Sequence, residues 1–135
     1  MRYLLDTNMV GDLVRHPQGP VTQAIRAVGE GAVCTSIIVA AELRYGATKR
    51  ASPRLTAQLD AVLHALEILP FAAPADVVYG QLRTSLEHRG LPIGAHDLLI
   101  AAQAVALDCT IVTDNEREFK RIDGLPCENW LRQAC

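Results

Sequence analysis

The sequence predicts an α/β fold, a sandwich in which a small, mainly parallel sheet is flanked by helices. Two observations predict it. Apolar runs of strand length alternate along the chain with longer segments whose apolar residues recur at helical spacing. Strands that alternate with helices pair in parallel through right-handed crossovers, which place helices on the faces of the sheet. The chain has 135 residues, half of them apolar, so we expect one domain over residues 1–135.

The first half of the chain begins with a predicted strand at the apolar residues 3–5. A polar trio, residues 6–8, ends this strand and opens a helix. Residues 21–28 predict a second helix, and the apolar run 32–35 predicts a second strand. A third helix is expected over residues 36–46, because a serine stands at its start as a cap and its apolar positions share one face.

The second half adds three predicted helices and two predicted strands. The helices are expected at residues 55–66, 75–88 and 97–107, and the strands at 68–71 and 110–113. The first of these helices is the clearest, because its apolar residues follow Pro53 at spacings of three and four. Pro70 confines the strand that contains it to an edge or an end of the sheet.

Net charge and cysteine usage restrict the function classes. A formal net charge of −2 does not indicate the broad cationic surface of a non-specific nucleic-acid binder, so affinity for a polyanion must come from local patches or bound cations. The four cysteines lack zinc-ligand spacing and disulfide-scaffold density, and Cys34 and Cys109 are expected in the core. No signal-peptide core or membrane-spanning stretch is apparent, so we expect a soluble, cytoplasmic protein.

Four carboxylates fall at the ends of predicted elements. Asp6 and Asp114 directly follow buried strands, at the end of a parallel sheet where ligand crevices form. Glu42 lies in the first half of a helix that follows a strand, and Asp97 lies at the start of another helix, where the helix dipole favours negative charge. Element ends of this kind converge on one rim, so we expect the four side chains to meet there.

Each acid also has a structural interpretation, and only the four together favour a functional one. Asp6 and Asp97 can cap helices, and Asp114 can be an ordinary turn residue. Glu42 lies close to a face that should be buried, where unpaired ionised glutamates are rare. Converging carboxylates repel one another unless they share a cation. An all-oxygen set favours Mg²⁺ or Mn²⁺ over zinc, and such an ion activates water for phosphodiester hydrolysis.

Short motifs that include these acids occur in a fixed order along nearly the whole chain. They are Leu4-Leu5-Asp6-Thr7-Asn8, then Ala41-Glu42-Leu43 with Gly46, then Gly94-Ala95-His96-Asp97 with Ile100-Ala101-Ala102, and then Val112-Thr113-Asp114-Asn115 with Phe119, Gly124-Leu125 and Asn129-Trp130. In this order and spacing, the motifs resemble those of the PIN-domain ribonucleases and, within them, of the VapC toxins of bacterial toxin–antitoxin pairs.

The resemblance implies a PIN fold and an endoribonuclease that leaves a 5′-phosphate. It implies a metal held chiefly by Asp6 and Asp97, with Glu42 and the Asp114 region completing the acidic pocket. It also implies a homodimer, and a VapB-type antitoxin whose tail enters the active-site groove.

The fourth metal ligand stays open at this point. In many relatives the fourth acid lies one position further along, where this chain has Asn115, so Asp114, Asn115 and Glu118 are all candidates. The residues expected to hydrogen-bond the metal ligands, or else to serve as turn and cap residues, are Thr7, Asn8, Thr113 and Asn115. His96 is disfavoured as a base, because the metal already activates water.

The substrate-binding residues are predicted less sharply. The basic residues that follow the acids and can contact RNA phosphates are Arg44, Lys49, Arg117 and Lys120, although such runs more often form solvated faces. With aromatic residues at only 4%, a base-stacking platform is not expected. Trp130 is interpreted as a clamp that packs the C-terminal tail onto the body.

Three rival functions remain. One is a phosphotransferase with an aspartyl nucleophile after the first strand, but such enzymes usually carry a second acid close behind, and Asp6-Thr7-Asn8 offers only one. Another is a catalytically silent PIN-like or receiver-like interaction module, for which clustered buried carboxylates would only add a desolvation cost. The third is a PIN nuclease that is not a toxin. We predict a Mg²⁺- or Mn²⁺-dependent endoribonuclease that acts as the toxin of a type II toxin–antitoxin pair.

Overall fold

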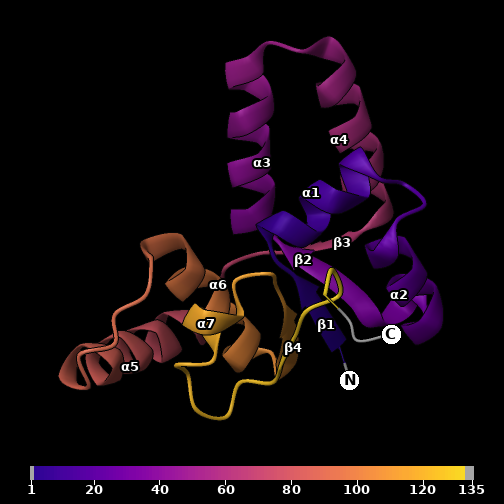
Figure 1. The fold of residues 1–135 in the computed structure, drawn as a ribbon. Coiled ribbons are helices and arrows are strands. Elements are labelled where there is room, and N and C mark those ends of the chain that lie inside the picture. The colour runs from indigo at the N-terminus through magenta and orange to yellow at the C-terminus, as the bar shows by residue number, and fades with distance from the viewer. Residues whose placement is uncertain (1, 133–135) are drawn as a thin grey trace.

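A sheet of five parallel strands forms the centre of the molecule. The computed structural model describes residues 2–132 (Figure 1). The strands are β1 (Arg2–Leu5), β2 (Val33–Ser36), β3 (Glu67–Leu69), β4 (Cys109–Val112) and β5 (Cys127–Glu128). Their order in the sheet is β3-β2-β1-β4-β5, and all neighbours pair in parallel. The predicted α/β fold with a mainly parallel sheet is confirmed.

Helices flank this sheet on both sides. They are α1 (Thr7–Arg15), α2 (Pro20–Val28), the single turn η1 (Glu30–Ala32), α3 (Ile37–Arg50), α4 (Pro53–Ala65), α5 (Ala75–His88), α6 (Ala95–Ala106) and α7 (Glu116–Phe119). In Figure 1, α1, α2 and α4 gather on one side of the sheet, α5 and α6 gather on the other, and α3 and α4 rise above the strands as a hairpin. Over residues 2–132, every helix is too short or too polar to span a bilayer.

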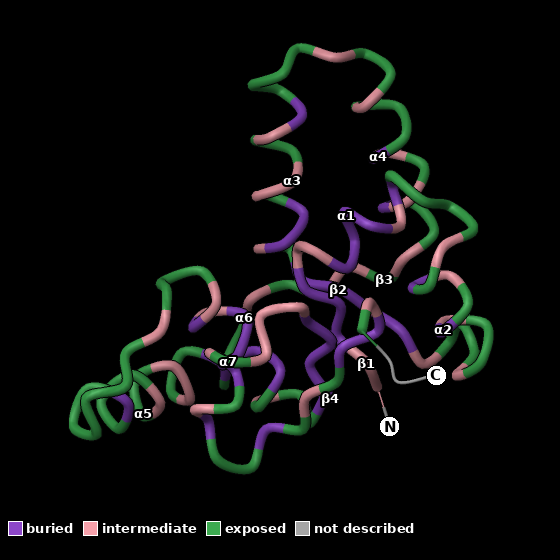
Figure 2. Tube along the Cα trace, viewed as in Figure 1, coloured by how far each residue is buried: buried purple, intermediate pink, exposed green. Residues whose placement is uncertain are grey.

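Strand β1 has a neighbouring strand on each edge, and its second half, Leu4 and Leu5, is buried. Leu4 pairs with Cys34 of β2 on one side and with Ile111 of β4 on the other. These three side chains are fully buried, and Figure 2 shows the central strands as buried while the far ends of α3 and α4 are exposed. A strand buried in this way reads as a continuous apolar run. One core cluster extends from Leu4 to Trp130, which supports the prediction of a single domain.

Two elements begin or end differently from the sequence prediction. Helix α6 starts at Ala95 behind Gly94, so Asp97 occupies its third position, and the interpretation of Asp97 as a helix cap is wrong. The strand predicted over residues 68–71 is β3 at Glu67–Leu69, which lies at the edge of the sheet as predicted but ends before Pro70. The short elements α7 and β5 were not predicted, because four and two residues are too few to show a periodicity.

Candidate active site

The carboxyl ends of β1 and β4 lie side by side because the two strands pair in register. Leu5 pairs with Val112, and each is the last residue of its strand. The amide of Asp6 donates to the carbonyl of Val112 at 2.9 Å. The next residue after β4, Thr113, donates its hydroxyl to Oδ2 of Asp6 at 2.8 Å. The parallel register therefore brings together two side chains that lie far apart in the sequence.

Asp6 is both a helix cap and a member of this site. Its Oδ1 accepts from the amide of Thr7 at 2.7 Å, which caps α1, and the whole residue is 2% exposed. Burial raises the pKa of the Asp6 carboxyl, the charge of Glu42 raises it further, and the hydrogen bonds from Thr7 and Thr113 oppose this rise. Asp6 is thus a buried acid whose two oxygens are fixed in direction.

Glu42 approaches Asp6 from the second turn of α3. That helix begins where the sequence predicts, since the hydroxyl of Ser36 accepts from the amide of Ile38 at 2.9 Å. The hydroxyl of Thr7 donates to Oε1 of Glu42 at 2.9 Å, so one threonine links both acids. Nδ1 of His96 lies 3.0 Å from Oε2 of Glu42. The contact of His96 is therefore with Glu42, and not with its neighbour in the sequence.

Asp97 faces the same region from the first turn of α6. The side-chain amide of Asn115 donates to Oδ2 of Asp97 and to Oε2 of Glu118, both at 2.9 Å. Burial, then the contact with Glu118 and the charge of Asp6, raise the pKa of Asp97 to about 7. The contact with Asp97 lowers the pKa of Glu118, which is the more exposed partner. In the metal-free protein, Asp97 is therefore the member of this pair that keeps its proton to the higher pH.

Asp114 turns away from these acids. Its Oδ1 accepts from the side-chain amide of Asn129 at 3.0 Å and pairs with Nε of Arg132 at 2.9 Å. Its backbone amide donates to Oδ1 of Asn8 at 3.0 Å, so Asn8 supports the loop rather than an acid. The Asp114 carboxylate is thus engaged by the C-terminal segment.

The three candidates for the fourth ligand therefore differ in position. Asn115 and Glu118 contact Asp97, whereas Asp114 makes its contacts with residues beyond β5. The sequence alone left this choice open. Of the three candidates, only Asn115 and Glu118 contact Asp97 among the described residues.

The donor set fits a hard divalent cation. Over residues 2–132, no group of three or more Asp, Glu, His or Cys side chains is close enough together to hold one ion directly. This separation suits Mg²⁺, which is commonly bound by one or two carboxylates with water in the remaining positions. The elevated pKa of Asp97 supports the fit, because a cation offsets the cost of a buried carboxylate that faces two others. One or two of the carboxylates of Asp6, Asp97 and Glu118 would hold such an ion directly, with water in the remaining positions.

The residues predicted to contact RNA lie on the surface, and several have protein partners. Arg44 pairs with Asp60 at 2.7 Å, and Lys120 pairs with a glutamate one turn earlier at 3.5 Å. The ammonium of Lys49 lies 5.8 Å from the centre of a tyrosine ring. Arg117 is exposed, next to the site loop. Their role in binding RNA stays a prediction.

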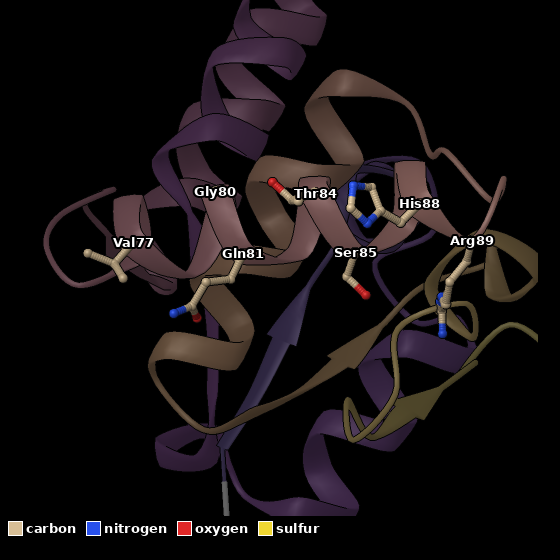
Figure 3. A pocket seen from close by; sticks show the side chains of 7 residues that line it. All are labelled: Val77, Gly80, Gln81, Thr84, Ser85, His88 and Arg89. Atoms are coloured by element: carbon tan, nitrogen blue, oxygen red, sulfur yellow. The ribbon is translucent and has the colours of Figure 1, made fainter.

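Of two hollows on the surface, one lies next to the acidic site and the other does not. A shallow depression of about 720 Å³ lies on the outer face of α5 (Figure 3). It is lined by Val77, Gly80, Gln81, Thr84, Ser85, His88 and Arg89. None of these is a carboxylate, so this hollow is not the acidic site. A groove of about 180 Å³ between α1, α3 and α4 has Glu42 in its wall and is the one that adjoins the site.

The chain is similar to known proteins over nearly its whole length. A family model described as the PIN domain matches residues 3–125. Ribonuclease VapC2 of Rickettsia felis is 43% identical over 132 residues, which cover 96% of this chain and 98% of that protein. The tRNA(fMet)-specific endonuclease VapC of Shigella flexneri is 33% identical over 131 residues, with 96% and 98% covered.

Solved structures give the same result for the fold. The crystal structure of VapBC2 from Rickettsia felis bound to a DNA fragment from their promoter matches with a TM-score of 0.89 and 39% identity, over 96% of this chain and 99% of that chain. The crystal structure of DNA-bound VapBC from Salmonella typhimurium matches with a TM-score of 0.85 and 32% identity, over 96% and 98%.

Proposed function

The chain belongs to the PIN domain family, and from this premise we propose that it is a metal-dependent endoribonuclease, the toxin of a type II toxin–antitoxin pair. What supports this function most directly is that Asp97 of α6, in contact with Glu118 of α7, lies near Asp6 at the carboxyl end of β1. A water-activating cation at such a cluster is a general solution for phosphodiester hydrolysis.

The side chains around the acids orient the carboxylates that would bind the metal cofactor. We assign Mg²⁺ or Mn²⁺, which when bound would acidify a water molecule and neutralise charge on the phosphate. Thr7 and Thr113 orient the two oxygens of Asp6, and Asn115 orients Asp97 and Glu118. Such supporting hydrogen bonds usually contribute strongly to metal affinity.

Glu42 has a separate part in this mechanism. Thr7 and His96 hold its two oxygens, so the carboxylate stays beside Asp6 without contacting Asp97 directly. A carboxylate held in this way can accept a proton from the attacking water at Oε2, where His96 also lies. We therefore assign Glu42 to proton transfer and assign Asp6 and Asp97 to cofactor binding.

The proposed substrate is RNA, and transfer RNA is the first class to test. One relative, from Shigella flexneri, is named a tRNA(fMet)-specific endonuclease, and it is similar to this chain from end to end. The purified chain should cleave RNA in Mg²⁺ or Mn²⁺, lose this activity in EDTA, and regain it when the metal is restored. Mapping the cleavage sites in total cellular RNA after brief expression of the protein identifies which class of RNA it cuts.

Substitutions identify the site in the same assay. Asp6→Asn and Asp97→Asn should abolish cleavage, whereas Asp76→Asn on the exposed first turn of α5 should leave it unchanged. Cleavage that persists in EDTA or in Asp97→Asn would contradict the proposed chemistry.

A VapB-type antitoxin is the proposed partner, since two structures that resemble this chain, with TM-scores of 0.89 and 0.85, are of VapBC complexes. The groove beside Glu42 is the surface we assign to its tail. The groove combines an apolar floor that includes Leu43 and Leu55 with the side chains of Arg15 and Arg50. Leu55→Glu should weaken inhibition by the antitoxin and leave RNA cleavage intact. The homodimer implied by the resemblance stays a prediction, which the mass of the antitoxin-free protein in solution tests.

A further inference from the structure

Asn129 lies between two carboxylates of the loop that carries the site. Its side-chain amide donates to Oδ1 of Asp114 at 3.0 Å and to Oε2 of Glu116 at 3.2 Å. Its Oδ1 accepts from the amide of Leu131 at 3.0 Å, and the residue is only 9% exposed. A single buried amide therefore joins the segment after β5 to both ends of a three-residue stretch of the loop.

That stretch contains Asn115, and the same loop continues to Glu118. Both side chains contact Asp97, so the conformation of the loop decides where two of the site residues point. The helix within the loop, α7, has four residues. One isolated turn is not stable in water, because helix nucleation is unfavourable. The loop must therefore be held by contacts with the rest of the protein.

Few polar contacts from outside the loop hold its first residues. The Asp114 amide donates to Asn8, and its carboxylate accepts from Asn129 and pairs with Arg132. The Arg132 side chain is 72% exposed, so its ion pair contributes little on its own. The bonds from buried Asn129 are stronger candidates, because removing one partner leaves the others desolvated and unpaired.

The chemistry of this contact requires an amide at position 129. Two carboxylates converge on one nitrogen, and an NH₂ group has two hydrogens to share between them. An aspartate of the same shape would present a third carboxylate and no donor. The contacts at position 129 therefore favour asparagine over aspartate, although the two side chains have nearly the same shape.

We infer that Asn129 is a positioning residue for this active site, which acts through Asp114 and Glu116 to keep Asn115 and Glu118 turned toward Asp97. Asp114 accordingly serves as the acceptor in this contact and not as a cofactor ligand. This inference rests on the proposed function, since it gives the loop a role in binding the divalent cation.

The test is Asn129→Asp in the full-length, antitoxin-free protein. Mn²⁺ affinity, measured by calorimetry, should fall about tenfold or more, as is usual for the loss of a supporting partner of a metal ligand. The kcat for RNA cleavage should fall with it while KM for RNA changes little. In the metal-free protein, the NMR resonance of the Asn115 side-chain amide should shift, because its hydrogen bonds are lost.

Two further variants separate positioning from general loss of structure. Glu128→Gln removes a carboxylate from the same segment while keeping an acceptor for the Trp130 indole, and it should leave Mn²⁺ affinity and the Asn115 resonance unchanged. The double variant Asn129→Asp with Asp114→Asn restores the contact between positions 114 and 129 with its direction reversed, while Glu116 still faces a carboxylate at position 129. It should recover part of the Mn²⁺ affinity that the single variant loses.

The outcomes are distinct. Wild-type Mn²⁺ affinity and an unshifted Asn115 resonance in Asn129→Asp would overturn the positioning role and leave the nuclease function standing. If Asn129→Asp does not fold, the double variant decides. Wild-type Mn²⁺ affinity in a folded double variant that lacks the reversed contact would overturn the positioning role. A wild-type protein that neither binds Mn²⁺ nor cleaves RNA would refute the proposed function itself.

Discussion

Asp97 illustrates a conflict between folding and function at one side chain. Its pKa rises from 3.8 to about 7 because it is buried beside Glu118 and Asp6. The folded protein therefore binds a proton more tightly than the unfolded chain does. Since the folded state holds more protons between these two values, its stability decreases as the pH rises from about 4 to about 7. A bound cation would reverse this loss, so the metal and the fold are coupled.

Asp97→Asn should therefore make the metal-free protein more stable while it removes activity. At pH 8 in EDTA, the melting temperature should rise by a few degrees, because the amide carries no charge to desolvate. At pH 5 the two proteins should melt at nearly the same temperature, because wild-type Asp97 is then protonated. Melting curves at both pH values check this, and an equal shift at both would contradict the sign of the pKa change.

Thr113→Val tests the hydrogen bond that fixes Asp6. The substitution keeps the shape of the side chain but removes the donor to Asp6 and the acceptor for the Asn115 amide. The free energy of unfolding should fall by about 1–3 kcal/mol, the usual cost of leaving buried polar groups unpaired. Urea denaturation measures it, with Thr84→Val on the exposed face of α5 as the matched control. A loss no larger than the control's would show that this bond contributes nothing.

Helix α6 is held at its middle by Gln103. The side-chain amide donates to the carbonyl of Leu69 at 3.0 Å and to that of Pro70 at 2.9 Å, which ties α6 to the end of the edge strand β3. The Gln103 side chain is almost fully buried, and its Oε1 has no protein partner. The connection therefore supplies a donor to two carbonyls at the end of β3.

Gln103→Leu should lower the free energy of unfolding by roughly 1–3 kcal/mol, because two buried carbonyls lose their donor while one unpaired oxygen is removed. Mn²⁺ affinity should stay near that of the wild type, since Gln103 lies about 9 Å along the helix from Asp97. Chemical denaturation and calorimetry on the same sample check both. A large loss of Mn²⁺ affinity with unchanged stability would contradict this assignment.

The elements were predictable from the sequence to the extent that their signals are local. Ser36 caps α3 and Pro53 opens α4, and both signals are contained within a few residues of the helix they start. The position of Asp6 at the end of a strand was predictable in the same way, because Asp6 is the polar residue that directly follows the apolar run 3–5. The start of α6 was misplaced because Gly94 offers no capping side chain, whereas Asp97 has the chemistry of one.

The fourth acid could not be chosen from the sequence for a different reason. Asp114, Asn115 and Glu118 lie in one short loop, and their directions depend on Asn129, which is outside that loop. Periodicity and residue type carry no information on such a contact. The prediction that a divalent metal is held there stays a prediction, with its ligand set revised toward Glu118.

The C-terminal segment closes the molecule against its first strand. Trp130 is 1% exposed, its ring lies 5.3 Å from that of Tyr3 in a tilted arrangement, and its indole donates to Glu128 at 2.9 Å. The interpretation of Trp130 as a clamp is confirmed by this burial. Residues near both ends of the described chain therefore share one part of the core.

Trp130→Ala should lower the free energy of unfolding by about 3–5 kcal/mol, a large part of the total stability of a domain this size. Trp130→Phe keeps most of the apolar contact with Tyr3 and should cost clearly less. Thermal unfolding of the two variants, followed by circular dichroism, gives the comparison. Equal losses would mean that the indole hydrogen bond, and not the packing, stabilises this end.

The place of β1 in the middle of the sheet has a consequence during synthesis on the ribosome. The strand that emerges first cannot be flanked on both edges until β4 has been translated, more than a hundred residues later. Asp6 then gains Asp97 and Glu118 only when nearly the entire chain is available. A chain that ends before β4 therefore lacks the second neighbour of β1, and with it the strand end that supports Asp6 through Val112 and Thr113.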